Sequence, residues 1–549
     1  MDFGTTYTGV YYWDGASKNL KGVLDKQTDQ KPFQPTMVLI HKDKFHFGSA
    51  ARDILVNPYK APQISKLFTG FKMLMGKMSN DVILRDRGYD TKGEFCPENI
   101  AEAYLKDRLE MIRMRCPDGK HIEKIVIGAP QIWFIDVDSI NARDSLQHIL
   151  SKIKDDFNRD HGNGAISDIV LESEPALACA YYIDRYRRRE NKDFNGHVLL
   201  IDYGGGTLDI NLCNVRQSGD DCEIKIQART GKGINDSALG LIGSAGMAFL
   251  DAVIQQTSQV TGLSNHEKQF LLQSLESELM EPSKMVELQK KFSHAKRAKV
   301  LISKLWDEKF AELADVNETV ITYGMLYDAF QHVIADTLKD ALDDISKQMD
   351  YLGIPFRSDH GDGSLKIVFT GGFCNFYLTR MEAEDYFKII SGDSRTNGME
   401  DGSEGRECAI ACGAALVAAG IVNIKQTYPY TLGIANEDCS KKWQVFSAGE
   451  DMVYDIPRYI DTVFIASAIP NLYFDDPPKY VKPLPKYRID IDTTKCKIGF
   501  SLDKMLNITV WVLPMEEISD GWRPKGNPTR LILPDLHTVF GKIVDIGDK

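Results

Sequence analysis

Strand-like and helix-like segments alternate along the first three quarters of the chain. Continuous apolar runs typical of strands covered on both faces occur at 124–129 (KIVIGA), 197–202 (HVLLID) and 365–370 (LKIVFT). Segments with helical spacing follow the first of these runs, at 142–156 and 175–187. Strands that alternate with helices predict an α/β fold.

Two regions depart from this alternation. Residues 264–350 are charged, rich in Lys, Glu and Leu, and helical in period, which predicts a helical insertion. After about residue 424, prolines cluster at 457–485, and the segments 487–492 and 497–513 alternate partially, as strands do. We therefore expect a C-terminal β domain of about one hundred residues.

One short pattern occurs twice. The chain reads DFGTTY at 2–7 and DYGGGTLD at 202–209. Both copies contain an aspartate, an aromatic residue, a glycine turn, a threonine and an outgoing strand. A pattern shared by two halves of a chain suggests a duplicated α/β unit that faces one cleft.

The repeated pattern suits phosphate chemistry. Glycine turns let backbone N–H groups approach a phosphate closely, and threonine hydroxyls add further donors. An aspartate at each strand end, Asp2 and Asp202, can hold Mg²⁺ through its water shell, because this hard ion prefers carboxylate oxygen and keeps waters. Each copy alone is a weak signal, since GGGT is more often a plain hairpin turn.

Charge and composition limit the possible partners. The 549 residues carry 66 basic and 78 acidic side chains, a formal charge of -12, which speaks against nucleic-acid or anionic-membrane binding. No signal-peptide pattern opens the chain, and the longest uncharged stretch, 408–424, is too short to span a bilayer comfortably. The ten cysteines are scattered without pairing-like spacing, so we expect reduced thiols and a cytoplasmic protein.

Five motifs, in order, resemble those of the heat-shock-70 chaperones of the actin-like ATPase superfamily. The segments DFGTTYTGV and IDYGGGTLDI resemble the family's two phosphate motifs, and IVFTGGFCNF its adenosine motif. The segments LESEPALACAYY and AIACGAALVAAG resemble its two connecting helices. Further on, YPYTLGI and IGFSLDKMLNITVWV resemble its substrate-binding β domain. The G-G-F form of the adenosine motif and the F-K-M-L around Lys72 look more like the family's divergent, lidless branch.

The resemblance implies a role for individual residues, with ATP or ADP and Mg²⁺ as ligands. Lys72, Glu174 and Asp202 would be catalytic, and Asp2 and Asp202 would hold the metal through water. Residues that would bind the nucleotide are Thr5, Thr6, Gly204, Gly205, Gly206, Thr207, Lys296, Arg297, Gly371 and Gly372. Asp209 matches the second acid of the phosphate motif.

Several of these residues also have a simpler structural interpretation. Lys72 could be a solvated helix lysine, Glu174 a helix cap, and Asp209 a surface strand residue. A solvated helix face is nearly as good an explanation for the pair at 296–297.

Departures from the family pattern weaken the chaperone reading. The family has a strand before its first aspartate, whereas only Met1 precedes Asp2 here. We therefore expect Asp2 to lie at a loose chain end. Ser293 and Asn375 replace an expected glutamate and arginine, the apolar acidic linker is replaced by residues 423–427, and no helical lid follows the β domain.

The sequence thus predicts two α/β lobes at 1–190 and 191–422, an insertion at about 264–350, and a β domain at 423–549. The leading hypothesis is a slowly hydrolysing, chaperone-like ATPase, with peptide clients and co-chaperones as possible partners. The alternative is a nucleotide-binding pseudo-ATPase or regulatory scaffold. A sugar or acid kinase would need a base beside the γ-phosphate, for which no signature is visible, and a filament-forming role fits the β segments poorly.

Overall fold

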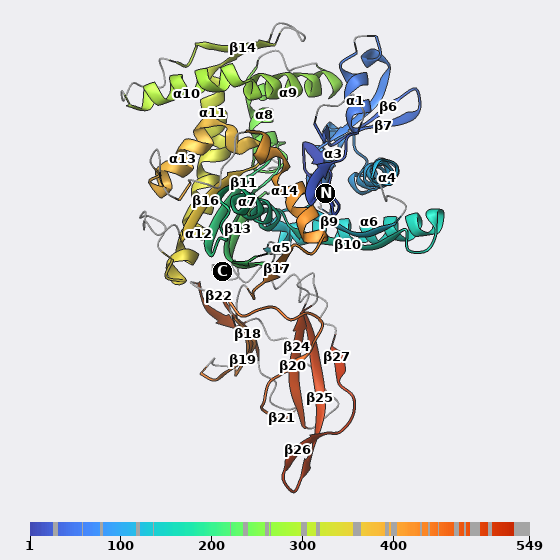
Figure 1. Ribbon diagram of the computed structural model, residues 1–549, viewed down its shortest axis with the longest axis vertical. Helices are drawn as coiled ribbons and strands as arrows, with labels where there is room; N and C mark the ends of the chain where they lie inside the picture. The colour runs from blue at the N-terminus through green and yellow to red at the C-terminus, as the bar shows by residue number, and fades with distance from the viewer. Residues whose placement is uncertain are drawn as a thin grey trace.

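The computed structural model shows a mixed α/β protein with several separate sheets (Figure 1). This confirms the predicted fold class at that level. The described residues are 1–25, 31–57, 59–76, 81–116, 121–135, 137–219, 221–233, 240–257, 263, 265–297, 305–313, 319–354, 364–389, 393, 395–396, 403–428, 431–436, 440–447, 449–465, 471–476, 479–483, 495–502 and 508–531.

The first phosphate motif lies in what we call the N-terminal sheet. Strand β1 (Asp2–Phe3) pairs antiparallel with β2 (Tyr7–Gly9), and β2 pairs antiparallel with β5 (Phe33–Pro35). Beside them, β9 (Ile122–Ala129) and β10 (Ile166–Ser173) form a parallel pair. Both of these strands end at the cleft, where their last residues lead into the site.

Met1 connects the two groups of strands. Its nitrogen donates to the Val126 carbonyl at 2.7 Å, and its carbonyl accepts from the Gly128 N–H at 3.1 Å. Met1 and Phe3 are buried. The expectation that Asp2 sits on a loose end is therefore wrong, because the first three residues occupy an interior position between β2 and β9.

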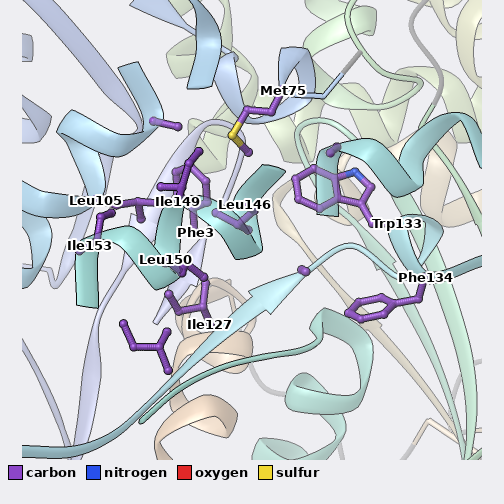
Figure 2. Close-up of a cluster of buried hydrophobic side chains, with 14 of the residues drawn as sticks. Phe3, Met75, Leu105, Ile127, Trp133, Phe134, Leu146, Ile149, Leu150 and Ile153 are labelled. Carbon is purple, nitrogen blue, oxygen red and sulfur yellow. The ribbon is translucent and has the colours of Figure 1, made fainter. Parts of the chain in front are cut away.

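Helices α4 (Pro97–Arg115) and α6 (Val137–His161) cover the N-terminal sheet. Figure 2 shows Phe3 of β1 and Ile127 of β9 among side chains of these helices, including Leu146 and Leu150. In α6 the buried residues 146, 149, 150 and 153 follow the i, i+3, i+4, i+7 spacing of one helix face. This apolar packing supports β1 and β9, whose ends carry the candidate site.

Smaller elements complete this part of the chain. The β3–β4 hairpin and the β6–β7–β8 sheet are both antiparallel. These elements are β3 (Tyr11–Asp14), β4 (Asn19–Gly22), β6 (Met37–His41), β7 (Lys44–Phe47), α1 (Gly48–Leu55), a 3-10 helix (Ala61–Gln63), β8 (Ile64–Thr69), α2 (Phe71–Leu74), α3 (Asp81–Asp86) and α5 (Ile132–Ile135).

The second phosphate motif lies in a five-stranded central sheet with the order β16-β11-β12-β13-β17. Its strands are β11 (Gly196–Tyr203), β12 (Leu208–Ser218), β13 (Asp221–Lys232), β16 (Leu365–Thr370) and β17 (Val422–Gln426). The residues expected to form a linker at 423–427 thus largely belong to β17, which pairs in parallel with β13.

Both faces of the central sheet are buried. On β11, Val198 and Leu200 pack with α7 (Glu174–Glu190) and α14 (Ser403–Ala418), whereas Leu199 and Ile201 pack with helices on the opposite face. The continuous apolar run at 197–202 reflects this double burial.

Helices α7 and α14 cross closely. Gly413 of α14 lies against the Leu177 carbonyl of α7, and a side chain at Gly413 would collide with that carbonyl. The helices can approach this closely because a glycine occupies the crossing point.

The region at 264–350 is mostly helical, as predicted, but it also contains a β-hairpin formed by β14 and β15. The elements on this side of the central sheet are α8 (Gly246–Gln255), α9 (Asn265–Met280), α10 (Pro282–Arg297), β14 (Lys309–Leu313), β15 (Thr319–Thr322), α11 (Tyr323–Ala329), a π-helix (Phe330–Ala335), α12 (Asp336–Tyr351), a 3-10 helix (Gly372–Asn375) and α13 (Tyr377–Phe387).

After β17 the described chain contains only strands, arranged in two sheets at the lower end of Figure 1. Residues 497–502 and 508–513 belong to the antiparallel pair β24–β25, whereas the predicted strand at 487–492 lies outside the described residues. The strands are β18 (Thr431–Ala435), β19 (Lys442–Phe446), β20 (Arg458–Tyr459), β21 (Phe464–Ile465), β22 (Asn471–Asp476), β23 (Lys479–Pro483), β24 (Lys495–Leu502), β25 (Ile508–Ile518), β26 (Gly521–Pro524) and β27 (Thr529–Leu531). Among the described residues, no helix combines the length and apolar character needed to span a bilayer.

Candidate functional site

A cavity of about 540 Å³ lies between the N-terminal and central sheets. It brings together twelve of the residues predicted to form the site. They are Asp2, Thr5, Thr6, Lys72, Glu174, Asp202, Gly204, Gly205, Gly206, Thr207, Gly371 and Gly372. The side chains of Lys296 and Arg297, at the end of α10, lie outside the described residues, so their role stays a prediction.

The two glycine-threonine turns face each other across the cavity. A side chain at Gly205 would collide with the Thr6 hydroxyl, and one at Gly206 would lie 2.6 Å from the Thr5 hydroxyl. Only glycine therefore allows the two turns to approach this closely. Backbone donors and hydroxyl groups from both sheets thus converge on one space, as a phosphate chain would require.

The start of α8 holds the second turn in place. The N–H groups of Ser244, Gly246 and Met247 donate to the carbonyls of Gly206, Gly204 and Gly205, at 3.1, 3.2 and 2.7 Å. These three bonds satisfy the carbonyls of the turn within the protein.

Lys72 lies deep in the cavity and forms an ion pair with Glu174. Its Nζ is 2.6 Å from Glu174 Oε1, and both residues are buried. The Nζ also lies 5.7 Å from the Phe3 ring centroid and 5.6 Å from that of Trp133. Aromatic faces attract a cation, so the lysine is held between two rings and its carboxylate.

Three further carboxylates surround this pair. Burial, with the nearby Glu174 charge, raises the pKa of Asp2 to about 7, and Lys72 opposes this shift. The same two causes raise the pKa of Asp209 to about 7, although the Thr207 hydroxyl and the Ile132 N–H donate to it. The pKa of Asp202 is raised well above its usual range, mainly by burial and then by Glu174.

The chemistry of these carboxylates fits a divalent cation. Among the described residues, a buried oxygen on each of Asp2, Asp202 and Asp209 has no hydrogen-bond partner. An unpaired buried carboxylate is costly, and a cation would relieve that cost. No group of three or more His, Cys, Asp or Glu in the described part of the chain is arranged to bind a metal directly.

One part of the cavity wall is apolar. It includes Met247 and Leu250 of α8, Leu279 of α9, and Phe373 and Phe376 beside the glycine pair. Gly371 has φ +82°, and a side chain there would lie 2.5 Å from Asp202 Oδ1. Positive φ and this close approach explain the glycine at that position.

One carboxyl group in this wall was not predicted. Glu276 of α9 lines the cavity, and burial raises its pKa to about 7, with a hydrogen bond from the Tyr7 hydroxyl opposing the shift. The segment QSLESELM gives no signal that separates Glu276 from Glu278, because only the tertiary arrangement brings Glu276 to the cavity. Helix α9, one helix before the predicted 296–297 pair, thus contributes both Glu276 and Leu279 to the cavity wall.

Comparison with known proteins supports the relationship inferred from the motifs. The chain is 28% identical to the chaperone protein DnaK of Mycoplasmoides gallisepticum over 244 residues, which is 41% of this chain and 34% of that protein. It is 24% identical over 257 residues to heat shock cognate 70 kDa protein 3 of Dictyostelium discoideum, covering 42% and 35% of the two chains. No protein-family model matches the sequence.

An α/β protein with two phosphate-type turns facing one carboxylate-rich cavity is the class that the fold and the site define. Its similarity to these two proteins supports a relationship with the heat-shock-70 family. The matched region spans only about a third of the length of each of these relatives.

Proposed function

We propose that this chain binds Mg²⁺–ATP in the cavity and hydrolyses it slowly, as a heat-shock-70-like ATPase. The observation that carries the proposal is the buried Lys72–Glu174 ion pair, which lies in the same cavity as both glycine-threonine turns. Phosphoryl transfer depends mainly on positioning and charge neutralisation, and these groups supply both.

The site residues divide into three roles under this proposal. Backbone groups at 204–206 and the hydroxyls of Thr5, Thr6 and Thr207 bind the phosphates. Asp2 and Asp202 orient Mg²⁺, which when bound neutralises charge on the phosphates. Lys72 stabilises charge at the γ-phosphate, and Glu174 holds Lys72 in place and orients the attacking water.

The base lies against the apolar part of the cavity wall in this arrangement. The glycine pair at 371–372 lets adenine approach the backbone, and Phe373 offers an aromatic wall. The chain then divides into two lobes at 1–190 and 191–422, an insertion at about 264–350 and a client-binding β domain at 423–549. Peptide clients and co-chaperones are the partners that this organisation suggests.

The proposal is tested by calorimetry of ATP with Mg²⁺ and by single-turnover hydrolysis on the same sample. We expect binding with slow hydrolysis, and loss of hydrolysis in Lys72→Ala. Binding without turnover in both proteins would identify a nucleotide-binding pseudo-ATPase or regulatory scaffold instead. The absence of binding would overturn the proposal and leave only the shared fold.

A further inference from the structure

Three buried polar side chains meet between the β9–β10 pair and the central sheet. The Gln131 Oε1 accepts a hydrogen bond from Ser173 Oγ at 2.8 Å and from Asn211 Nδ2 at 3.1 Å. Asn211 Nδ2 also donates to Ser173 Oγ, at 2.9 Å. At most 1% of each side chain is exposed. We call these residues the polar triad.

Each member of the polar triad is next to a group of the candidate site along the chain. The serine ends β10 and directly precedes Glu174. The glutamine directly precedes Ile132, whose N–H donates to Asp209 Oδ1 at 2.9 Å. The asparagine follows Asp209 by two residues on β12, so both side chains point to the same face of that strand.

The triad also connects two separate parts of the structure. The glutamine and the serine belong to the N-terminal half of the cleft, and the asparagine belongs to the central sheet. Buried polar groups cost about 1–3 kcal/mol each when they lose their partners. The three bonds, all between 2.8 and 3.1 Å, therefore favour one relative position of β10 and β12.

Packing alone does not account for the asparagine. Among the described residues, its Oδ1 has no hydrogen-bond partner although the side chain is fully buried. An apolar residue of similar size would avoid that cost. What the polar side chain provides at this position is its pair of bonds to Gln131 and Ser173.

We propose that the polar triad positions Glu174 and Asp209 across the cleft. The arrangement needed for hydrolysis then forms only when β10 and β12 hold the relative position that the triad favours. The inference rests on the proposed ATPase function. The triad residues do not touch the nucleotide, and they act through the two acids beside them. Losing the triad should therefore slow hydrolysis more than it weakens binding, because a displacement of about 1 Å can cost on the order of 100-fold in rate.

The test is Asn211→Leu, which keeps the size of the side chain and removes both bonds across the cleft. The matched control is Asn214→Leu on the same strand, where the lost bond is the 3.0 Å contact with His197 Nε2, away from the cavity. We expect single-turnover hydrolysis to fall at least about tenfold in Asn211→Leu, with the Mg²⁺–ATP dissociation constant within about threefold of wild type. The control should keep both values.

A second variant tests whether the triad acts as a unit. Ser173→Ala alone should slow hydrolysis, and Ser173→Ala with Asn211→Leu should cost little more than the larger single effect, since coupled residues are not additive. If Asn211→Leu does not fold, Asn211→Ser replaces it, because a shorter hydroxyl cannot keep both bonds. Equal slowing by the control, strictly additive effects, or an unchanged rate in folded Asn211 variants would overturn the proposal.

These outcomes separate the two proposals. If wild-type protein binds but never hydrolyses ATP, the ATPase function fails, and the triad proposal fails with it. If wild-type protein hydrolyses ATP and the triad variants do so at the same rate, only the triad proposal fails.

Discussion

Lys72 Nζ lies 2.6 Å from Glu174 Oε1, and Asp2, Asp202 and Asp209 lie around this pair. One lysine thus lies among several buried carboxyl groups, of which Asp2, Glu174 and Asp202 line the cavity. The pKa values of all three aspartates are raised by burial and by the Glu174 charge, and lowered by Lys72. Glu174 therefore raises the pKa values of the three aspartates, whereas Lys72 lowers them.

Because of these opposite effects, substitutions at Lys72 and Glu174 should change the stability of the protein differently. Lys72→Ala removes the cation and should lower the free energy of unfolding without nucleotide by roughly 3 kcal/mol, as for a broken buried ion pair. Glu174→Gln removes one of several repelling charges, so the stability of the nucleotide-free protein should be unchanged or higher. Both variants should lose hydrolysis, because each removes a group proposed to act on the γ-phosphate or the water.

Chemical denaturation at pH 8, with single-turnover hydrolysis on the same proteins, checks this prediction. Glu172→Gln, two residues earlier on β10, serves as the control for Glu174→Gln. Destabilisation of Glu174→Gln as large as that of Lys72→Ala would contradict the electrostatic account.

Removal of the metal should weaken nucleotide binding strongly. Asp2 and Asp202 line the cavity with buried carboxylate oxygens, and without Mg²⁺ these charges repel a triphosphate. We expect the ATP dissociation constant to rise at least about 100-fold in EDTA, because charge repulsion is strong at buried sites. Asp202→Asn should bind Mg²⁺–ATP more weakly and show a smaller difference between Mg²⁺ and EDTA. Calorimetry under both conditions measures this, and equal affinities in wild type would contradict it.

The acid in the apolar wall predicts a pH-dependent stability. Burial raises the pKa of Glu276 from 4.5 to about 7, so the folded protein holds this proton over a pH range in which the unfolded chain releases it. The favourable contribution is complete below pH 4.5 and is lost as pH rises to about 7. Glu276→Gln cannot ionise, so it should exceed wild type in stability at pH 8, by on the order of 2 kcal/mol.

Denaturation of Glu276→Gln and wild type at pH 5 and pH 8 tests this sign. Glu278→Gln on the same helix is the matched control and should show no such pH-dependent gain. A gain for Glu276→Gln that is larger at pH 5 than at pH 8 would contradict the assignment.

Much of this site could be predicted because its signals are local. The glycine-threonine turns at 4–6 and 204–207 are short motifs, and the apolar runs around them predict buried strands that end at the turns. The strand at 365–370 has the predicted bounds in the structure, and the helix beginning near Pro175 is only slightly longer than expected.

The features that were missed depend on tertiary contacts. Glu276 and the triad asparagine look like ordinary polar positions of a helix and a strand. Only the packing of distant elements buries the asparagine and places Glu276 on the cavity wall. Met1 fills an interior sheet position through main-chain bonds, which no side-chain pattern reveals. The segment 423–427 stands where the family has its linker, but pairing with β13 makes residues 423–426 part of a strand.

Strand β17 lies at the junction between the central sheet and the C-terminal strands. Arg229 of β13 is buried and donates from Nη2 to the Thr427 carbonyl at 2.5 Å and from Nη1 to Gln426 Oε1 at 3.4 Å. On the same strand, Lys225 forms a more exposed ion pair with Asp451.

Arg229→Ala should lower stability by roughly 2–3 kcal/mol, because a charged hydrogen-bond donor to a buried carbonyl is lost. It should also make the chain after residue 426 more sensitive to limited proteolysis. Lys225→Ala is the control and should cost less than about 1 kcal/mol, as exposed ion pairs do. If both variants had the same small effect on stability and cleavage, β17 and the C-terminal sheets would be held to the central sheet by main-chain pairing alone.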